Sequence, residues 1–445
     1  MPIGLPVRLV RRHNRVTLPW LSGNEGVVAT QSGTISAMTT TLPPSVASLL
    51  QRRVLESGSQ PFLTFYDDLT GERTELSHAT FENWTSKTAN LLVEELDAQP
   101  GDQVALALST HWTTAVIAFA CWQIGACAVV MDPGEAPVAP TGARAVFVEE
   151  AEVTRGAAPR GGQPVAVVGA GMGGRLVDGP PAGAGSGWLA YGEEVLAFPD
   201  DYDGPGAVLD GDALLVTATG GAAVRLTQRN VLAAADALAA WGLAPGARLL
   251  VTRPPQFVDG LVLGLLGPYL AGGSVVLVGN LDPATFWRKA ADERATGALV
   301  DATMLDALPA PEPAHDMRHL LCPAGAAPAI AERATERVGV SVHVGHGLVA
   351  ATSASSLVPA ETGPEVREWL AGMTSPTVGP ATSRAEMAVT GPDGTPVRQG
   401  ARGEIQVRGD VVSPDAGEWL HSGDEGFIQA APDGREWAFL TGRIT

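Results

Sequence analysis

The strongest constraint on the fold is an alternation of strand-like and helix-like apolar segments through most of the chain. "QPGDQVALAL" predicts a turn and a buried strand, "WTTAVIAFACWQIGA" a helix and "CAVVMDPG" a second buried strand. Strands that are apolar throughout are typical of parallel sheets covered by helices on both faces. The alternation resumes at Asp212 and runs to "VSVHVGHG". The pattern therefore predicts a layered α/β protein with mainly parallel sheets.

Composition narrows the range of functions. The chain has 48 acidic against 29 basic residues, a formal net charge of −19, which repels nucleic acid and anionic membranes. The apolar run Ala115–Met131 invites a membrane interpretation, but Gln123 and Gly125 interrupt it, and a buried helix followed by a strand explains it better. We therefore predict no nucleic-acid partner and no membrane span.

A glycine motif in "PVAVVGAGMGG" matches the dinucleotide-binding fingerprint when it is taken alone. Gly169, Gly171 and Gly174 have the required spacing and follow a predicted strand. That fingerprint needs a helix to start at the glycines, since the helix N-terminus holds the pyrophosphate. Pro180 and Pro181 come soon after, among further glycines, and exclude such a helix. We interpret the motif as a strand that enters a loop.

The first residues look unlike the rest of the chain. Residues 1–37 combine arginines with a Gly/Ser/Thr-rich run and lack the apolar segment of a signal peptide. Met38 then opens a regular pattern, so this stretch is either a disordered extension or a misassigned start. The three cysteines fit neither a metal site nor a disulfide framework, which predicts a cytoplasmic protein.

The chain changes character again near its end, where short strands and turns replace helices. We therefore predict a division into four regions. They are an extension over 1–37, a first α/β subdomain over 38–205, a second over 206–378, and a small β-rich subdomain over 379–445.

Several segments, in order, resemble the adenylate-forming superfamily of acyl-CoA synthetases, luciferases and peptide-synthetase adenylation domains. These are "LTQRNVLAA", "GLVLGLLGPYLAGGSVVLV", "PDGTPVRQGARGEIQVRGDVV", "WLHSGDEGFI" and "FLTGR". "YDDLTGERTELS" and "SKTANLL" are most similar to short bacterial synthetase-like proteins. The resemblance implies a large domain with two α/β subdomains in an αβαβα arrangement and a β-rich subdomain. The family's small C-terminal domain is expected to be absent, because the sequence stops at Thr445, just after Arg443 at the hinge entrance.

The family's phosphate loop reads T-S-G-T-T-G-x-P-K-G-V-x-L-T, and the matching stretch here is shorter and lacks lysine. Thr217, Thr219, Gly220 and Gly221 remain as candidate phosphate-binding residues. A lysine there stabilises charge during phosphoryl transfer. Arg225, expected where the next helix begins, is the candidate substitute, although a guanidinium is not equivalent to an ammonium. Neither Lys87 nor Lys289 aligns with a catalytic lysine of the family.

Other site positions come from the same resemblance. The family's Y-G-x-T-E element is replaced by a stretch that begins at His346 and Gly347 and ends at Ala350, where the magnesium-binding glutamate is lost. We predict no metal pair at His343 and His346, but two strand-end histidines. The resemblance leaves His346 as a side chain that can stack on adenine, as the family's tyrosine does, with Gly347 beside it. The other nucleotide-binding candidates are Gly325 and Ala326 beside adenine, Asp424 on the ribose hydroxyls and Arg443 at the hinge entrance, and Phe257 is the candidate at the acyl tunnel.

These losses predict a synthetase-like protein that is impaired in carboxylate adenylation on its own. ATP or AMP is the expected ligand, magnesium binding is expected to be weak or absent, and CoA is expected only with a C-terminal domain supplied in trans. Two alternatives stay open. One is a non-catalytic nucleotide- or acyl-binding module, or a regulatory partner of a complete synthetase or carrier protein. The other is an active acyl-CoA or acyl-AMP ligase.

Overall fold

The computed structural model describes residues 41–138, 140, 142–159, 161–177, 179, 188–204, 206–217, 223–239, 246–312, 314–323, 328–359 and 362–444. All of them belong to one compact unit. The predicted extension over 1–37 lies outside the described residues.

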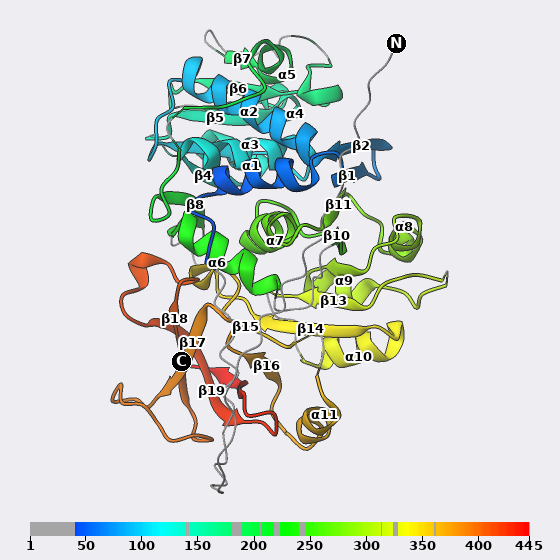
Figure 1. Ribbon diagram of the computed structural model, residues 1–445, viewed down its shortest axis with the longest axis vertical. Helices are drawn as coiled ribbons and strands as arrows, with labels where there is room; N and C mark the ends of the chain where they lie inside the picture. The colour runs from blue at the N-terminus through cyan, green and yellow to red at the C-terminus, as the bar shows by residue number, and fades with distance from the viewer. Residues whose placement is uncertain are drawn as a thin grey trace, which may run out of the picture. The chain divides into compact units, whose positions relative to one another are not determined.

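A seven-stranded sheet contains the first run of predicted strands (Figure 1). Its order is β7-β6-β5-β3-β4-β8-β9, and its neighbouring strands are parallel except for the antiparallel pair β8–β9. Its strands are β3 (Gln103–Ala107), β4 (Cys127–Met131), β5 (Ala145–Glu149), β6 (Val165–Val168), β7 (Trp188–Ala190), β8 (Asp212–Thr217) and β9 (Ala223–Thr227).

An eight-stranded sheet has the order β15-β14-β13-β12-β10-β11-β1-β2. Its central strands are parallel, and only its two edge pairs, β14–β15 and β1–β2, are antiparallel. Its strands are β1 (Pro61–Asp67), β2 (Glu72–Ser77), β10 (Arg248–Val251), β11 (Ser274–Gly279), β12 (Gly297–Leu299), β13 (His319–Cys322), β14 (Ser341–His346) and β15 (Ser356–Leu357).

The third sheet is antiparallel, as the short strands near the chain end predicted. Its order is β16-β20-β19-β18-β17. Its strands are β16 (Thr377–Pro380), β17 (Ala385–Thr390), β18 (Gly403–Gly409), β19 (Leu420–Ala430) and β20 (Glu436–Arg443).

Helices cover both faces of the two parallel sheets. The α-helices are α1 (Val46–Ser57), α2 (His78–Glu94), α3 (Trp112–Ile124), α4 (Glu150–Thr154), α5 (Tyr191–Glu194), α6 (Gln228–Ala239), α7 (Gly267–Ala271), α8 (Phe286–Asp292), α9 (Ala302–Ala307), α10 (Pro328–Val338) and α11 (Pro364–Ala371). Shorter or irregular helical segments are η1 (Pro133–Val138), η2 (Met172–Gly174), η3 (Val195–Ala197), η4 (Asp259–Leu266), η5 (Pro283–Thr285), η6 (Val349–Ala351) and η7 (Pro414–Ala416).

The layers are visible in how the side chains of one strand divide between two cores. In β10, Leu249 and Val251 join the large cluster that also contains helices α1, α3, α6 and η4, whereas Leu250 joins a second cluster with α8, α9 and α10. Successive strand residues point to opposite faces of a sheet, so this division requires apolar cover on both sides. The predicted layered α/β architecture is confirmed.

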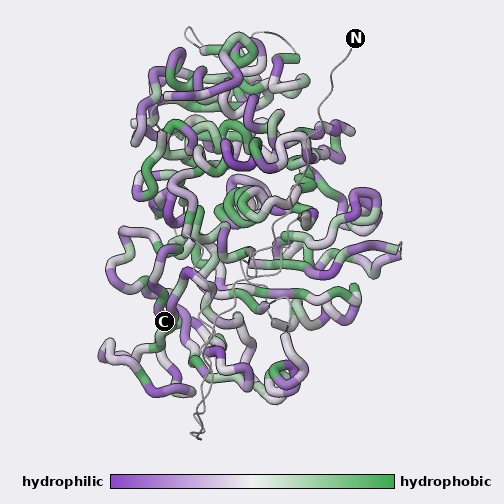
Figure 2. Tube along the Cα trace, viewed as in Figure 1, coloured by the Kyte–Doolittle hydropathy of each residue, from purple (hydrophilic) through white to green (hydrophobic). Residues whose placement is uncertain are grey.

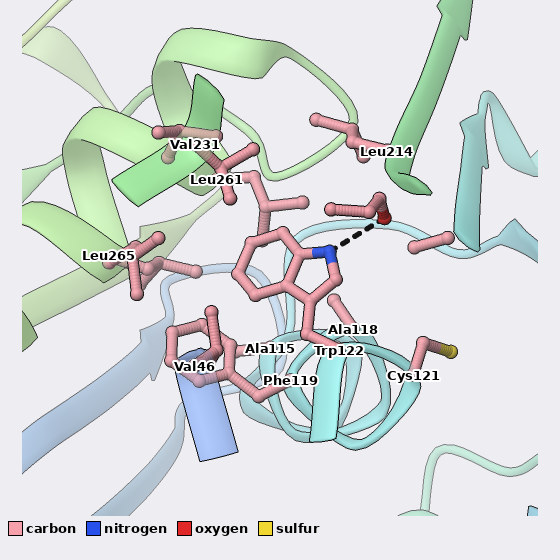
Figure 3. Packing of buried hydrophobic residues seen from close by; sticks show 14 of the residues in the cluster. Val46, Ala115, Ala118, Phe119, Cys121, Trp122, Leu214, Val231, Leu261 and Leu265 are labelled. Carbon is pink, nitrogen blue, oxygen red and sulfur yellow. Dashed lines mark hydrogen bonds between the residues drawn. The ribbon is translucent and has the colours of Figure 1, made fainter. Parts of the chain in front are cut away.

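Trp122 lies at the centre of the large cluster and is fully buried (Figure 3). Its indole nitrogen donates a hydrogen bond of 2.7 Å to the carbonyl oxygen of Ala213, at the start of β8. Leu261 and Leu265 of η4 pack near Trp122. The helical region formed by η4 and α7 is hydrophobic, as Figure 2 shows. The polar atom of this large core side chain is therefore satisfied, and its hydrogen bond connects α3 to β8.

The structure corrects one element of the sequence interpretation. The segment after the phosphate loop was expected to enter a helix directly, with Arg225 at the helix start. Instead, residues 223–227 form β9, which pairs with β8, and α6 begins only at Gln228. The short "AVRLT" run alternates in a way that suits an edge strand. The loop therefore closes a β-hairpin.

Two further expectations concern the glycine motif and the subdomain boundaries. The glycine motif comes after β6 and leads only to the single turn η2, so no α-helix starts there in the part described to Leu176 and Val177. The boundaries at 205 and 378 stay a prediction. Both parallel sheets take strands from before and after residue 205.

Among the described helices, none is long and apolar enough to cross a membrane.

Candidate nucleotide site

Side chains from two different sheets meet at Asp424. Strand β19 presents this carboxylate, which is largely buried, beside the end of β14. One oxygen, Oδ2, lies 2.7 Å from Nε2 of His346, and the other, Oδ1, lies 3.0 Å from Nε of Arg443 on β20. The sequence assigned these three residues to one nucleotide site, and the fold brings them into direct contact.

His346 is held on both its backbone and its ring. Its carbonyl oxygen accepts a hydrogen bond from the hydroxyl of Ser355, and its ring is buried. Nδ1 of the ring is buried without a hydrogen-bond partner among the described residues. Since a neutral imidazole has one donor and one acceptor, the contact with Asp424 favours the tautomer with the proton on Nε2.

The segment after β14 contains Ala350, which the resemblance aligned with the family's magnesium ligand. Gly347 leads from the strand into η6, which includes Ala350. The carbonyl oxygen of Ala350 accepts a 2.7 Å hydrogen bond from the backbone of Ser413, which fixes this turn against the connection between β18 and β19. A methyl group offers no oxygen ligand for a hard cation.

The phosphate loop is described only at its two ends. Thr217 is the last residue of β8, and its backbone pairs with Ala223 at the start of β9. Thr219, Gly220 and Gly221 lie outside the described residues, as do the adenine-side candidates Gly325 and Ala326.

Arg225 is bound by two aspartates. Its NH1 lies 2.8 Å from Asp212 on the paired strand β8, and its Nε and NH2 lie 3.1 and 2.6 Å from the two carboxylate oxygens of Asp415 in η7. The hydrogen bonds that the guanidinium donates to Asp415, and then the one to Asp212, raise its pKa above the ordinary value. The cation that the sequence offered as a lysine substitute is thus neutralised by its neighbours.

The two lysines have structural contacts elsewhere. Lys87 on α2 donates to the carbonyl oxygen of Phe198. Lys289 on α8 pairs with Asp68 at 2.6 Å, and its Nζ lies 4.0 Å from the ring centroid of Tyr66. In the described part of the chain, neither lysine contacts Asp424 or Arg225.

Phe257 precedes η4 and is 42% exposed, so it is not a core residue. The guanidinium of Arg253 lies 3.6 Å from its ring centroid. Arg253 also binds the carboxylate of Asp259 at 3.0 Å, and that carboxylate is almost completely buried. Burial raises the pKa of Asp259, which the nearby guanidinium only partly offsets. The residue predicted at the acyl tunnel therefore stacks on an arginine.

The histidines of β14 do not converge. Nε2 of His343 lies 3.2 Å from Nδ1 of His319, whereas His346 contacts Asp424. Burial lowers the pKa of His343 to about 4. Within the described residues, no group of His, Cys, Asp and Glu side chains has the arrangement of a metal site.

The comparisons with known proteins agree with this fold. A family model for AMP-binding enzymes matches residues 50–160 and 222–414, which together make up more than half of the chain. This chain belongs to that family of AMP-binding, adenylate-forming enzymes, so the resemblance found in the sequence is confirmed. Residues 217–221 of the loop fall between the two matched segments, whereas Arg225 and Thr227 lie in the second one.

Individual relatives extend this result. A TIGR03089 family protein of Mycobacterium tuberculosis is 38% identical over 242 residues, which cover 54% of this chain and 91% of that protein. The structure of a Mycobacterium tuberculosis fatty acyl CoA synthetase superposes with a TM-score of 0.72 at 19% identity, over 90% of this chain and 78% of that one. An anthranilate CoA ligase, AuaEII, solved with anthranoyl-AMP, has a TM-score of 0.72 at 18% identity, again over 90% and 78%.

Three contacts of the site had no signal in the sequence. Asp415 lies 190 residues from Arg225, and no motif links the two. The hydrogen bond between His346 and Asp424 spans 78 residues. Arg253 and Asp259 are closer along the chain, but their i, i+6 spacing matches no regular helical pair, so it does not predict their contact.

Proposed function

We propose that this chain binds an adenine nucleotide or an acyl adenylate and is impaired, on its own, in forming an acyl adenylate from ATP and a carboxylic acid. Membership of the AMP-binding family implies the use of ATP or AMP. The observation that carries the proposed impairment is the pairing of Arg225 with Asp212 and Asp415.

The carboxylate of Asp424 supports the binding part of the proposal. An ionised carboxylate offers about four acceptor positions. His346 and Arg443 each take one position, so two remain for the neighbouring hydroxyls of a ribose. Arg443 is mostly exposed and can shift when a nucleotide arrives, whereas the buried ring of His346 keeps Asp424 in place. The arrangement therefore leaves capacity for a sugar without breaking the buried contact.

The charges support the impaired part. One guanidinium between two carboxylates leaves a net negative group next to the strands that flank the phosphate loop. Triphosphate binding is favoured by cations and opposed by carboxylates, and loss of one stabilising charge at such a centre typically costs about a hundredfold or more in rate. Ala350 removes the carboxylate that would hold magnesium in this family. Two separate requirements of the chemistry are thus unmet.

The test combines calorimetry with ATP–pyrophosphate exchange on the purified full chain. AMP is expected to bind, and exchange with a panel of short, long and aromatic carboxylic acids is expected to stay at background. Exchange well above background with any acid would overturn the proposed impairment. Failure of AMP, ATP and an acyl-sulfamoyl adenosine to bind would overturn the binding proposal.

Asp415→Asn provides a directed variant. It removes one carboxylate from Arg225 and leaves the size of the side chain unchanged, so ATP is expected to bind several-fold more tightly, with a smaller effect on AMP. Glu386→Gln is the matched control, since it removes an exposed carboxylate from a pair with Arg408 on the third sheet. Equal ATP affinity in wild type and Asp415→Asn would show that the charge around Arg225 does not affect triphosphate binding.

A further inference from the structure

A cavity of about 400 Å³ lies between the two parallel sheets, at the ends of their strands. The seven-stranded sheet reaches it through Leu108 and Glu149, and the eight-stranded sheet through Thr252 and Val278. Its size is within the ordinary range of small-molecule sites. Its described lining contains no residue of the proposed nucleotide site, so a ligand in this cavity would bind whether or not the chain binds a nucleotide.

The position of the cavity favours ligand binding. In the seven-stranded sheet, β4 lies on one side of β3, and the chain then crosses to place β5 and β6 on the other side. Strand order therefore reverses at β3 and β5. Open parallel sheets bind ligands outside the carboxyl ends of their strands at such a switch point. Ser109, just after β3, and Glu149, at the end of β5, stand at that point and line the cavity.

The described lining is acidic and includes neither lysine nor arginine. It contains four carboxylates, namely Asp67, Glu72, Glu149 and Glu150. Thr252 and Pro254, on either side of Arg253 in the chain, line the cavity. The guanidinium of Arg253 itself is bound to Asp259. A lining with four carboxylates and neither lysine nor arginine favours a cationic ligand.

One of these carboxylates keeps a free acceptor. Oε1 of Glu149 accepts a 2.7 Å hydrogen bond from the backbone of Ser109, and a second one from its hydroxyl. Oε2 of Glu149 has no partner among the described residues. By contrast, both oxygens of Glu72 already accept hydrogen bonds, from His111, Trp112 and Thr74. Glu149 therefore has an oxygen that can receive a ligand.

A second acceptor is independent of the charges. The amide oxygen of Gln256, on a residue that lines the cavity, is buried and accepts no hydrogen bond in the described structure. A buried acceptor without a donor destabilises the folded protein, and a ligand donor would remove that cost. The rest of the wall includes apolar side chains, among them Leu108, Val278 and Met304.

We propose that this cavity binds a small organic amine that has an apolar body. Its ammonium group contacts the carboxylate of Glu149, a further N–H or O–H donor reaches Gln256, and its carbon skeleton packs on Leu108, Val278 and Met304. The class is set by the combination of free acceptors, acidic lining and apolar wall.

Calorimetry on the full chain tests this with three probes of one length: hexylamine, hexan-1-ol and hexanoate. Hexylamine is expected to bind more tightly than either of the others, and its affinity is expected to fall as salt is raised, because the contact is partly electrostatic. No binding of hexylamine, or equal or tighter binding of hexanol or hexanoate, would overturn the proposal.

Glu149→Gln keeps the shape of the side chain and removes its charge. It is expected to lower the affinity for hexylamine by roughly tenfold or more and to leave the affinity for hexanol unchanged. Glu386→Gln, on the third sheet, is the control and should leave hexylamine affinity unaltered. Met304→Trp fills the cavity and keeps Glu149, so it should abolish hexylamine binding. This variant tests the proposal if Glu149→Gln does not fold. Unchanged hexylamine affinity in either cavity variant would overturn the assignment.

Discussion

Replacement of Asp424 by asparagine keeps the size of the side chain but removes its charge and one of its two acceptor oxygens. The contact with His346 is buried, with the two side chains only 5% and 11% exposed, and a hydrogen bond to a charged group in such a place contributes about 1.5–3 kcal/mol. The contact with Arg443 is worth less, about 0.2–1 kcal/mol, because the arginine is 73% exposed. Asparagine can still accept one hydrogen bond. We therefore expect the free energy of unfolding to fall by about 1–3 kcal/mol.

Urea denaturation monitored by tryptophan fluorescence measures this change. Arg443→Gln is the control, and it should cost less than about 1 kcal/mol, since it leaves the buried contact intact. A double-mutant cycle with His346→Phe should give a coupling energy of about 1 kcal/mol or more between His346 and Asp424. A loss below about 0.5 kcal/mol in Asp424→Asn, the range of ordinary surface changes, would refute the idea that this pair stabilises the site.

Three other predictions concern individual residues. Burial lowers the pKa of His78 to about 4 from 6.5, so the unfolded chain binds this proton first and stability falls as the pH drops from 6.5 to 4. His78→Phe should remove about 1.4 kcal/mol per pH unit from that dependence, and an unchanged slope in urea titrations would contradict the assignment. Ala350→Glu should make ATP binding depend on Mg²⁺, measured by calorimetry against Ala350→Gln, and identical affinities for the two variants would argue against a metal position here. Trp122→Phe should lower unfolding free energy by about 2–4 kcal/mol, because it leaves a gap and an unpaired carbonyl at Ala213, and a loss under about 1 kcal/mol in urea would show that the core closes around it.

The layered fold was predictable because its strands are apolar on both faces. Segments such as β3 and β4 need cover from two sides, and their sequence contains that requirement directly. Strand β9 was missed because five residues at the edge of a sheet carry a weak pattern, and its pairing with β8 outweighs the signal of the helix that comes next.

The contacts within the candidate site were not predictable. The resemblance to the family assigned Asp424, His346 and Arg443 to one candidate nucleotide site. It gave no indication that Asp424 and His346 bond to each other, because β14 and β19 belong to different sheets. The pairing of Arg225 with Asp415 depends on where η7 packs, a property of the whole fold. Local sequence specifies elements, whereas ion pairs between distant elements depend on the assembled structure.

Each parallel sheet contains strands from distant parts of the sequence, and this has a consequence for synthesis on the ribosome. Strand β1 is made early, yet its parallel neighbour β11 begins only at Ser274. In the other sheet, β8, the parallel neighbour of β4, begins only at Asp212. A nascent chain of half length therefore exposes unpaired apolar edges, which are prone to aggregation until the later strands emerge. Cutting the gene near residue 205 would yield two fragments that each lack part of both sheets, and co-expression of the pieces would be needed to recover a folded protein.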